Sequence, residues 1–445
     1  MTHGNRSAAQ SCQPATAADV LDREQRITLQ LERLRQTVHW ACDRVPWYRQ
    51  HWTAAGISPE DIRTLTDLAR VPFITKDDLR DAYPTGLFAV PLDQIVRLHA
   101  SSGTTGKQVL VPYTQSDLAV WTECMVRVLT WFGIHSGDVL QNAYGYGLFT
   151  GGLGFHYGAE ALGATVIPMS GGNTDRQIVV MQDFGTTAVC CTPSFFLHIA
   201  DRAGELGVDL RTLRLRVGVF GAEPWSEEMR QRIQQAAGIE AFDIYGLAEI
   251  VGPGVAAECA AHQGLHVLED HFYPEVIDPC TGLVVPEGEP GELVLTTLSK
   301  QALPMVRYRT GDITAICPGP CPCGRTLRRI RRVSHRSDDL FIVKGVNVFP
   351  AQIEAALLAV EGTLPHYQIV LGQPQDPDRV EVQIEVSPDM FSDRIGVLEE
   401  LQGRLSRAIR QAVGVQLEVR LVEPRTLARS EGKARRVIDQ RRSPG

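Results

Sequence analysis

Ser101-Ser102-Gly103-Thr104-Thr105-Gly106-Lys107 is a stretch whose residues suit the binding of phosphate. Residues 95–98 before it and 108–112 after it have the pattern of strands, so the stretch is expected to connect the strands of a hairpin. Its two glycines allow a tight bend that brings backbone N–H groups close to an anion. Four hydroxyls and Lys107 add hydrogen-bond donors and positive charge. We predict a phosphate-binding loop, with a plain polar turn as the alternative.

This loop differs from that of the P-loop NTPases. Their motif has four residues between its glycines and leads into a helix. Here two residues separate Gly103 from Gly106, and a predicted strand follows. The loop is therefore expected to hold ATP in a different way.

The composition is that of a globular enzyme. The chain has 445 residues, a net charge of -8 and 44% hydrophobic residues, and this length favours at least two domains. There is no basic stripe for a nucleic acid and no apolar run of the roughly 20 residues that span a bilayer. Residues 1–19 are polar, lack a signal-peptide core and are predicted to form a disordered leader. We expect a cytoplasmic protein with no nucleic-acid or membrane partner.

Predicted strands and helices alternate through the middle of the chain, which indicates an α/β sheet core. After residue 335 the pattern changes to a small α+β unit. We predict an N-terminal ATP- and acid-binding domain over residues 20–335, a hinge at 336–338 and a small mobile C-terminal domain over 339–445. Predicted strands cover 187–191, 217–220, 242–245, 340–343, 367–371, 380–386 and 415–421. Predicted helices cover 22–52, a short segment from Thr75, 114–132 with Thr114 or Ser116 as N-cap, 226–237, a segment opened by Pro350, and 398–409.

Further segments occur in an order that points to one family. They are 144–154 (YGYGLFTGGLG), 220–225 (FGAEPW), 243–249 (DIYGLAE), 269–274 (EDHFYP), 308–312 (YRTGD), 336–339 (RSDD), 345–350 (GVNVFP) and 430–434 (SEGKA). With the phosphate loop, they resemble the phenylacetate–CoA ligases of the adenylate-forming superfamily, which also includes carrier-protein adenylation domains and luciferases.

The resemblance implies a two-step reaction that uses ATP and Mg2+. A small aromatic carboxylic acid is activated as its acyl adenylate with release of pyrophosphate, and the acyl group then passes to coenzyme A. One alternative replaces coenzyme A with a carrier protein or an amine as the acceptor. Another is a binding protein without turnover, although the presence of Glu249 and Lys433 disfavours it. The resemblance also suggests a homodimer.

The resemblance assigns roles to individual residues. Glu249 matches the magnesium-associated glutamate, and a carboxylate is a typical magnesium ligand. Lys433 matches the lysine that neutralises charge during adenylate formation, and Lys107 is the other catalytic cation. Asp312 matches the aspartate that accepts hydrogen bonds from both ribose hydroxyls, and Arg336 matches an arginine near the ribose and phosphate. The other expected nucleotide contacts are Ser101, Ser102, Gly103, Thr104, Thr105, Gly106, Gly221, Ala222, Glu223, Pro224, Asp243, Tyr245 and Gly246.

The C-terminal unit is expected to turn between the two steps. The hinge residue is predicted to be Asp338 in preference to Asp339. Lys344 and Gly345 are expected to face the pantetheine arm of coenzyme A.

The segment 144–154 reads as a flexible loop rich in glycine and aromatic residues. Its flat walls could admit a planar ring, and in the family it lines the pocket for the aryl acid. The alternative is that its aromatic side chains are simply core. The expected pocket residues are Tyr144, Tyr146, Gly147, Phe149, Gly152 and Gly154.

Four cysteine and histidine residues suggest a structural zinc site. Cys321-Pro322-Cys323 is a tight pair of thiols, and Cys259 and His266 lie upstream. Two pairs of this kind supply the four ligands of a tetrahedral zinc site if the fold brings them together. His262 and Cys317 are competing ligands. The alternative to a zinc site is that these four residues are unconnected.

Overall fold

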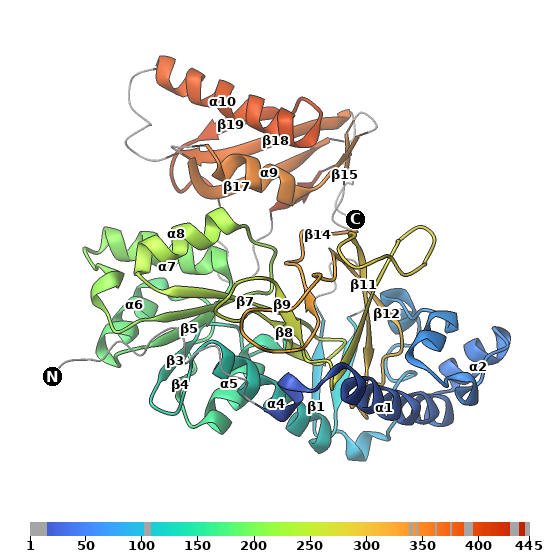
Figure 1. Cartoon of the computed structure of the whole chain (residues 1–445). Helices are drawn as coiled ribbons and strands as arrows, with labels where there is room; N and C mark the ends of the chain where they lie inside the picture. The colour runs from blue at the N-terminus through green and yellow to red at the C-terminus, as the bar shows by residue number, and fades with distance from the viewer. Residues whose placement is uncertain are drawn as a thin grey trace.

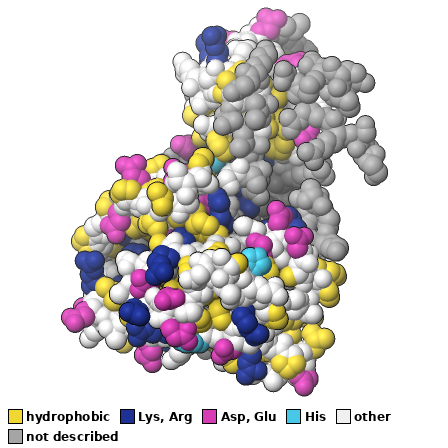
Figure 2. Space-filling model, turned by 90° about the vertical axis from the view of Figure 1, so that its right-hand side faces the viewer, with side chains coloured by type: hydrophobic (Ala, Val, Ile, Leu, Met, Phe, Trp, Pro, Cys, Tyr) yellow, Lys and Arg dark blue, Asp and Glu magenta, His cyan; other side chains and the backbone are white. Residues whose placement is uncertain are grey.

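The computed structural model describes residues 16–101, 108–337, 341–343, 346–360, 363–373, 376–386, 395–427 and 436–440. In Figure 1 they form a large body, with a smaller C-terminal body above it. Charged side chains of both signs are interspersed over the face of the large body that Figure 2 shows. In this described part of the chain, no helix is long and apolar enough to cross a membrane.

An eight-stranded sheet forms the centre of the large body, in the order β13-β9-β8-β7-β6-β5-β3-β4. Strands β3 to β7 pair in parallel, and β7, β8, β9 and β13 pair antiparallel. β5 and β6 are buried along their whole length, as expected for parallel strands covered on both faces. The predicted α/β core is confirmed. The strands are β3 (Val139–Asn142), β4 (Thr165–Ile167), β5 (Ala188–Cys191), β6 (Val217–Phe220), β7 (Glu240–Leu247), β8 (Gly252–Ala257), β9 (Leu265–Val267) and β13 (Arg329–Ile330).

Helices cover this sheet. The predicted N-cap Thr114 is confirmed: its Oγ1 accepts a hydrogen bond from the backbone N–H of Asp117 at 3.1 Å. α5 packs closely on α4 because its inner face carries glycine. A Cβ at Gly158 would lie 2.3 Å from Cβ of Met125. The helices are α4 (Gln115–Trp131), α5 (Gly151–Leu162), α6 (Thr174–Asp183), α7 (Pro193–Glu205) and α8 (Glu227–Ala237).

Two smaller sheets complete the large body. β1 (Arg97–Ala100) pairs antiparallel with β2 (Leu110–Tyr113), which confirms the predicted hairpin around the phosphate loop. A second sheet has the order β10-β11-β12-β14. Its strands are β10 (Phe272–Ile277), β11 (Gly291–Thr297), β12 (Tyr308–Thr314) and β14 (His335–Arg336).

The N-terminal region is helical, as predicted, but Pro46 divides it into two helices. Proline suits the first turn of a helix and cannot continue the preceding one. The helices are α1 (Arg23–Arg44), α2 (Pro46–Ala54) and α3 (Lys76–Asp81). Short 3₁₀ helices cover Ala17–Val20, Pro59–Asp61, Leu65–Arg70, Leu92–Gln94 and Leu210–Thr212.

The prediction of a disordered leader over 1–19 is wrong for its last residues. Ala17–Val20 is a 3₁₀ helix, and the side chain of Asp19 is fully buried. Arg127 Nη2 donates to Asp19 Oδ1 at 2.8 Å, and Trp131 Nε1 donates to Asp19 Oδ2 at 3.0 Å. A composition-based prediction could not anticipate these distant partners. Residues 1–15 lie outside the described residues.

The C-terminal body is the predicted α+β unit. A four-stranded sheet, in the order β19-β18-β17-β20, packs its apolar face against α9 and α10. The final parallel strand β20 was not predicted. The elements are β15 (Phe341–Val343), β16 (Val346–Val348), α9 (Pro350–Leu358), β17 (Thr363–Gln373), β18 (Asp376–Val386), α10 (Ile395–Val413), β19 (Glu418–Val422) and β20 (Val437–Asp439).

Candidate active site and metal centre

The predicted adenine segment directly follows the carboxyl end of β6, where open α/β sheets bind their ligands. Gly221 lies so close to β7 that a Cβ would be 2.4 Å from the carbonyl oxygen of Ile244. Ala222 has φ +68°, a conformation unfavourable for most side chains. Glu223 accepts a hydrogen bond from the backbone N–H of Ser194 at 2.8 Å. Pro224 then leads toward α8, so the segment has a fixed, unusual backbone path.

Three predicted nucleotide residues meet between β7, β12 and β14. The phenol of Tyr245 donates to Asp312 Oδ2 at 2.6 Å, and Arg336 Nη1 donates to Asp312 Oδ1 at 2.9 Å. Gly311, with φ +77°, packs against the Arg336 guanidinium. Burial and the nearby Asp312 carboxylate raise the pKa of Tyr245, which keeps the phenol a donor.

Asp243 lies in a buried group of charges that the sequence did not predict. Arg332 Nε donates to Asp243 Oδ2 at 3.1 Å, and Arg230 binds both oxygens of Glu258 at 2.7 and 2.9 Å. Burial and the Glu258 carboxylate raise the pKa of Asp243 to about 6. The partners are distant in sequence from Asp243, so no local motif links them.

Glu249, the predicted magnesium ligand, is a buried carboxylate beside two lysines. Lys76 Nζ lies 3.4 Å from Glu249 Oε1, and Lys300 Nζ donates to the Glu249 carbonyl at 3.2 Å. Burial lowers the pKa of Lys300 to about 8. A buried carboxylate fits magnesium, which proteins often hold by one or two carboxylates together with substrate phosphates. Sequence reasoning missed both lysines, because neither belongs to a phosphate motif.

Gly246 explains how the chain reaches Glu249. A Cβ at Gly246 would lie 1.9 Å from the carbonyl oxygen of Gly252, so only glycine allows β7 and β8 to approach there.

One residue of the predicted phosphate loop, Ser101, is described. It is buried at the end of β1, and its backbone N–H donates to the Val109 carbonyl at 3.0 Å. Several predicted site residues lie outside the described residues: Ser102, Gly103, Thr104, Thr105, Gly106, Lys107, Asp338, Lys344, Gly345 and Lys433.

The aromatic segment is only partly the loop that was predicted. Residues from Gly151 onward form α5, so the prediction of a loop over 144–154 is wrong for its last four residues. Glycines are read as loop signals, but here they serve close packing. A Cβ at Gly152 would lie 2.5 Å from the carbonyl oxygen of Gly145.

The aromatic residues of this segment have different environments. Tyr144 is buried and stacks on Phe155, with ring centroids 5.3 Å apart. Tyr146 accepts a hydrogen bond from Asn142 Nδ2 at 2.7 Å, and its hydroxyl lies 3.1 Å from Nδ1 of His156. Phe149 is 55% exposed. Gly147 is exposed beside it. Tyr144 is therefore part of the core, as in the alternative interpretation, whereas Phe149 is an exposed aromatic ring.

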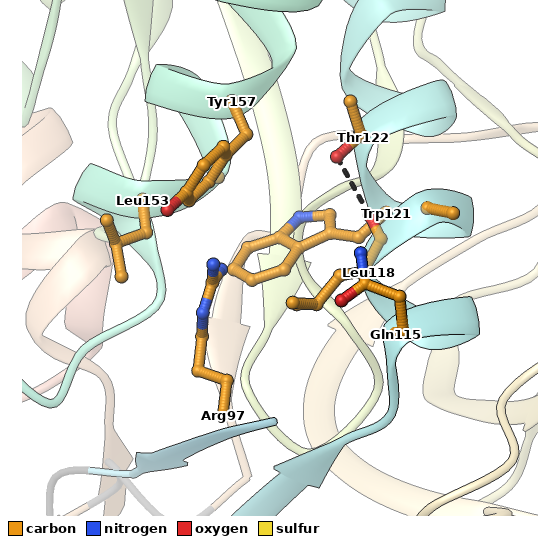
Figure 3. Close-up of a pocket in the computed structure, with 9 residues that line it drawn as sticks. Arg97, Gln115, Leu118, Trp121, Thr122, Leu153 and Tyr157 are labelled. Atoms are coloured by element: carbon orange, nitrogen blue, oxygen red, sulfur yellow. Dashed lines mark hydrogen bonds between the residues drawn. The ribbon is translucent and has the colours of Figure 1, made fainter. Parts of the chain in front are cut away.

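Gly154 faces a different space. It lines a cavity of about 480 Å3 between β1, α4 and α5, together with Arg97, Trp121 and Tyr157. Figure 3 shows the Arg97 side chain extending from β1 toward Tyr157 and Trp121. Tyr144, Tyr146 and Phe149 do not line this cavity. Of the predicted pocket residues, Gly154 lines this cavity beside α4, and the others do not.

The four predicted zinc ligands meet in one buried cluster. Cys259 Sγ lies 3.7 Å from Cys321 Sγ, and Cys323 Sγ lies 3.4 Å from His266 Nε2. All four ligand atoms lie within 4.8 Å of one another. A shell of three sulfurs and one nitrogen at this spacing fits a closed tetrahedral site.

The competing ligands lie outside this cluster. His262 forms contacts with Glu258 at 3.3 Å and Glu240 at 3.4 Å. Cys317 packs against Gly264 instead of joining the four. The structure therefore favours the predicted set over either replacement.

Comparison with known proteins defines the class to which this fold and site belong. The family model described as AMP-binding enzyme matches residues 18–299, and the model described as AMP-binding enzyme C-terminal domain matches residues 345–441. Phenylacetate–coenzyme A ligases from Pseudomonas putida and Thermus thermophilus are 50% and 48% identical to this chain. The alignments cover 93% of both chains in the first case, and 95% of this chain and 98% of the relative in the second.

Solved structures agree. A crystal structure of 2-hydroxyisobutyryl-CoA ligase in the postadenylation state matches with a TM-score of 0.90 at 29% identity, over 96% of this chain and 93% of that one. The same ligase in the thioesterification state, with its adenylate and CoA, matches with a TM-score of 0.71 at 31% identity, over 95% and 91%. The fold and site are those of an adenylate-forming enzyme. More narrowly, the chain belongs to the phenylacetate–CoA ligase family. The predicted ATP-dependent activation of an acid through its adenylate, followed by thioesterification to coenzyme A, is confirmed.

Proposed function

We propose that the acid is a small monocyclic aromatic one of the phenylacetate type. The observation that carries this proposal is the half-buried Tyr146 and the exposed Phe149 in the aromatic segment 144–154. Flat aromatic walls favour a ring over a flexible aliphatic chain, because stacked rings gain energy beyond the area they bury. The relatives named phenylacetate–coenzyme A ligase support the same class of substrate.

A panel of acids tests the substrate class. Pyrophosphate release is measured with phenylacetate, hydroxy- and aminobenzoates, acetate and a long fatty acid, each with and without coenzyme A. We expect an aryl acid to give the highest kcat/KM. A fatty acid that exceeded every aryl acid would refute the proposal. Product analysis with coenzyme A then separates thioester formation from release of free adenylate.

The roles proposed for the site residues are those that the family resemblance assigns. Asp312, held by Tyr245 and Arg336, receives the ribose. Glu249 receives the magnesium ion, and Gly221 to Pro224 border the adenine. Lys433 and Lys107 neutralise charge on the phosphates. In the other half-reaction, Lys344 and Gly345 face coenzyme A. The hinge is placed at Asp338, between β14 and β15.

We also infer which step the described arrangement of the two bodies serves. The match to the postadenylation-state ligase is closer than the match to the thioesterification state, at nearly equal identity. The relative placement of the two bodies here therefore resembles the postadenylation state of that enzyme more than its thioesterification state.

The cysteine cluster is proposed to hold one structural zinc ion. Its four ligand atoms are buried within 4.8 Å of one another, which is the observation in favour. Hydrogen bonds from Cys259 and His266 lower the pKa of the Cys323 thiol, which favours the thiolate that zinc binds. A complete shell leaves no open position, so the ion would stabilise the fold and take no part in turnover.

A further inference from the structure

The C-terminal body rests on one face of α7 and α8, away from the hinge. Arg232 on α8 donates from Nη1 to the Thr363 carbonyl at 3.2 Å and from Nη2 to the Leu358 carbonyl at 3.4 Å. His366 Nε2 lies 3.2 Å from Oδ2 of Asp201 on α7. In Figure 1 the C-terminal body lies above these two helices. Asp201, Glu205 and Arg232 are called the docking face below.

An apolar contact accompanies these polar ones. Leu358, the last residue of α9, is 7% exposed and belongs to the apolar cluster of the large body that includes Phe196 and Ile233. It would be uncovered if the C-terminal body turned away. At the edge of the same face, Arg425 forms an ion pair with Glu205.

Arg232 is suited to a contact that forms and breaks. Burial lowers its pKa, and the nearby Asp201 carboxylate partly offsets the effect. Within the described residues, its guanidinium donates to backbone carbonyls of the C-terminal body. The guanidinium of arginine stays protonated in proteins. When the two bodies separate, its N–H donors must therefore bond to water instead of to these carbonyls. The hydrogen bonds are therefore made only while the bodies are docked.

The docked body includes a residue that follows the predicted catalytic lysine closely in the sequence. Arg436 lies three positions after Lys433, and its guanidinium lies 4.5 Å from the ring centroid of Tyr367. Tyr367 in turn donates to Glu354 Oε2 at 2.8 Å. Burial lowers the pKa of Arg436, but Tyr367 and the carboxylates of Glu354 and Glu223 together raise it above its ordinary value. Arg436 thus packs on a phenol that is itself hydrogen-bonded to a carboxylate of the C-terminal body.

We propose that the docking face is used in adenylate formation alone, and that Arg232 is a positioning residue that holds the C-terminal body in the adenylate-forming arrangement. The proposal rests on the confirmed two-step activity and on the arrangement inferred above. When the body turns for thioesterification, Asp201, Glu205 and Arg232 lose these partners. Weakening the face should then slow the first half-reaction and leave the second unchanged or faster.

The test measures the two half-reactions separately in Arg232→Gln. Adenylate formation is followed by single-turnover pyrophosphate release, and thioester formation by adding coenzyme A to enzyme supplied with acyl adenylate. The ratio of the first rate to the second is expected to fall about tenfold, the scale of one hydrogen bond to a charged group. Arg211→Gln is the matched control. Among the described residues Arg211 pairs with Asp209 of the large body and with no residue of the C-terminal body, so this change should leave the ratio unchanged.

A charge exchange keeps the test decisive if Arg232→Gln lowers the melting temperature. Arg425→Glu places like charges opposite Glu205 and should lower the ratio. Adding Glu205→Arg to that variant restores an opposite pair across the two bodies and should raise the ratio again, although it also places like charges beside Arg202 within α7. The proposal is overturned if the ratio stays constant in these variants, or if both half-reactions fall in parallel. The ratio can be measured with whichever acid the substrate panel selects, so a failed aryl-acid hypothesis does not affect it.

Discussion

Tyr245 donates its phenolic hydrogen bond to Asp312 over 2.6 Å, from the end of β7 to the middle of β12. Arg336 holds the other carboxylate oxygen from β14. A carboxylate can accept several hydrogen bonds at once, which suits the proposed role of Asp312 as acceptor of the ribose hydroxyls. Residues 67 positions apart in sequence thus form one rigid acceptor for the nucleotide.

Removing the phenol should weaken nucleotide binding selectively. Tyr245→Phe leaves Asp312 without one donor, and a hydrogen bond to a charged group contributes about 1.5–3 kcal/mol. We expect KM for ATP to rise roughly tenfold or more, with a much smaller change in KM for the acid. Steady-state kinetics with each substrate varied in turn measure both. Equal increases in the two KM values would show that Tyr245 does not act through the nucleotide.

Lys433 should be needed in one half-reaction alone. Lys433→Ala removes a positive charge used while the α-phosphate is displaced, and losing one such group costs about 10²-fold or more. Thioester formation from supplied acyl adenylate should be largely unchanged. Arg441→Ala, which removes another cation of the same segment, is the control and should affect neither step. Equal losses in both steps at an unchanged melting temperature would refute the role of this lysine.

Metal removal should destabilise the protein. About one zinc per chain is expected in protein purified without chelators. Cys321→Ser combined with Cys323→Ser should abolish metal binding and lower the melting temperature, because the binding energy of a structural site is also folding energy. Cys317→Ser is the matched control and should keep the metal. Elemental analysis that finds no zinc in the unsubstituted protein would end the hypothesis.

Lys300 should make stability depend on pH in alkaline solution. Burial lowers its pKa from 10.5 to about 8 in the folded chain. Between these values the unfolded chain binds the proton and the folded chain does not, so Lys300 makes stability rise with pH. Below pH 8 the cost of the buried charge is fully present. Across the window the change amounts to at most about 3 kcal/mol.

The comparison with Lys300→Met isolates this effect. Tyrosine and cysteine residues titrate in the same range, but they contribute equally to both proteins. The free energy of unfolding of the unsubstituted protein, minus that of the variant, should increase from pH 8 to pH 10. Urea denaturation at fixed pH values measures it. A difference that stays flat or decreases would show that Lys300 titrates near its ordinary pKa.

Local patterns predicted those parts of the fold whose causes lie close together in the chain. The apolar runs of β5 and β6 are short and continuous because helices cover both faces of the sheet. Thr114 was recognisable as an N-cap because its partner Asp117 lies three residues away. The residues of the proposed zinc site were recognisable by type, although their approach depends on the pairing of β9 with β13.

Other features depend on contacts that no local pattern contains. Lys76 and Lys300 reach Glu249 from elements far from it in sequence. β20 has only three residues, and its pairing with β17 spans more than sixty positions. The start of α5 was read as a loop because glycine disfavours helices in isolation. Gly152 is required by the close approach of the backbone at Gly145, and Gly154 and Gly158 by that of α4, which only the folded structure reveals.

The buried Asp19 connects the beginning of the described chain to the cysteine cluster. Trp131 donates to its carboxylate, and the edge of the same indole contacts the ring of His266. Thr326, three residues after Cys323, donates from its backbone N–H to the Asp19 carbonyl at 3.0 Å. If the cluster holds the proposed zinc ion, loss of that ion should also loosen the packing around Asp19. Cleavage by proteases near Asp19 would then show how much of the protein carries the ion, before any loss of turnover is measured.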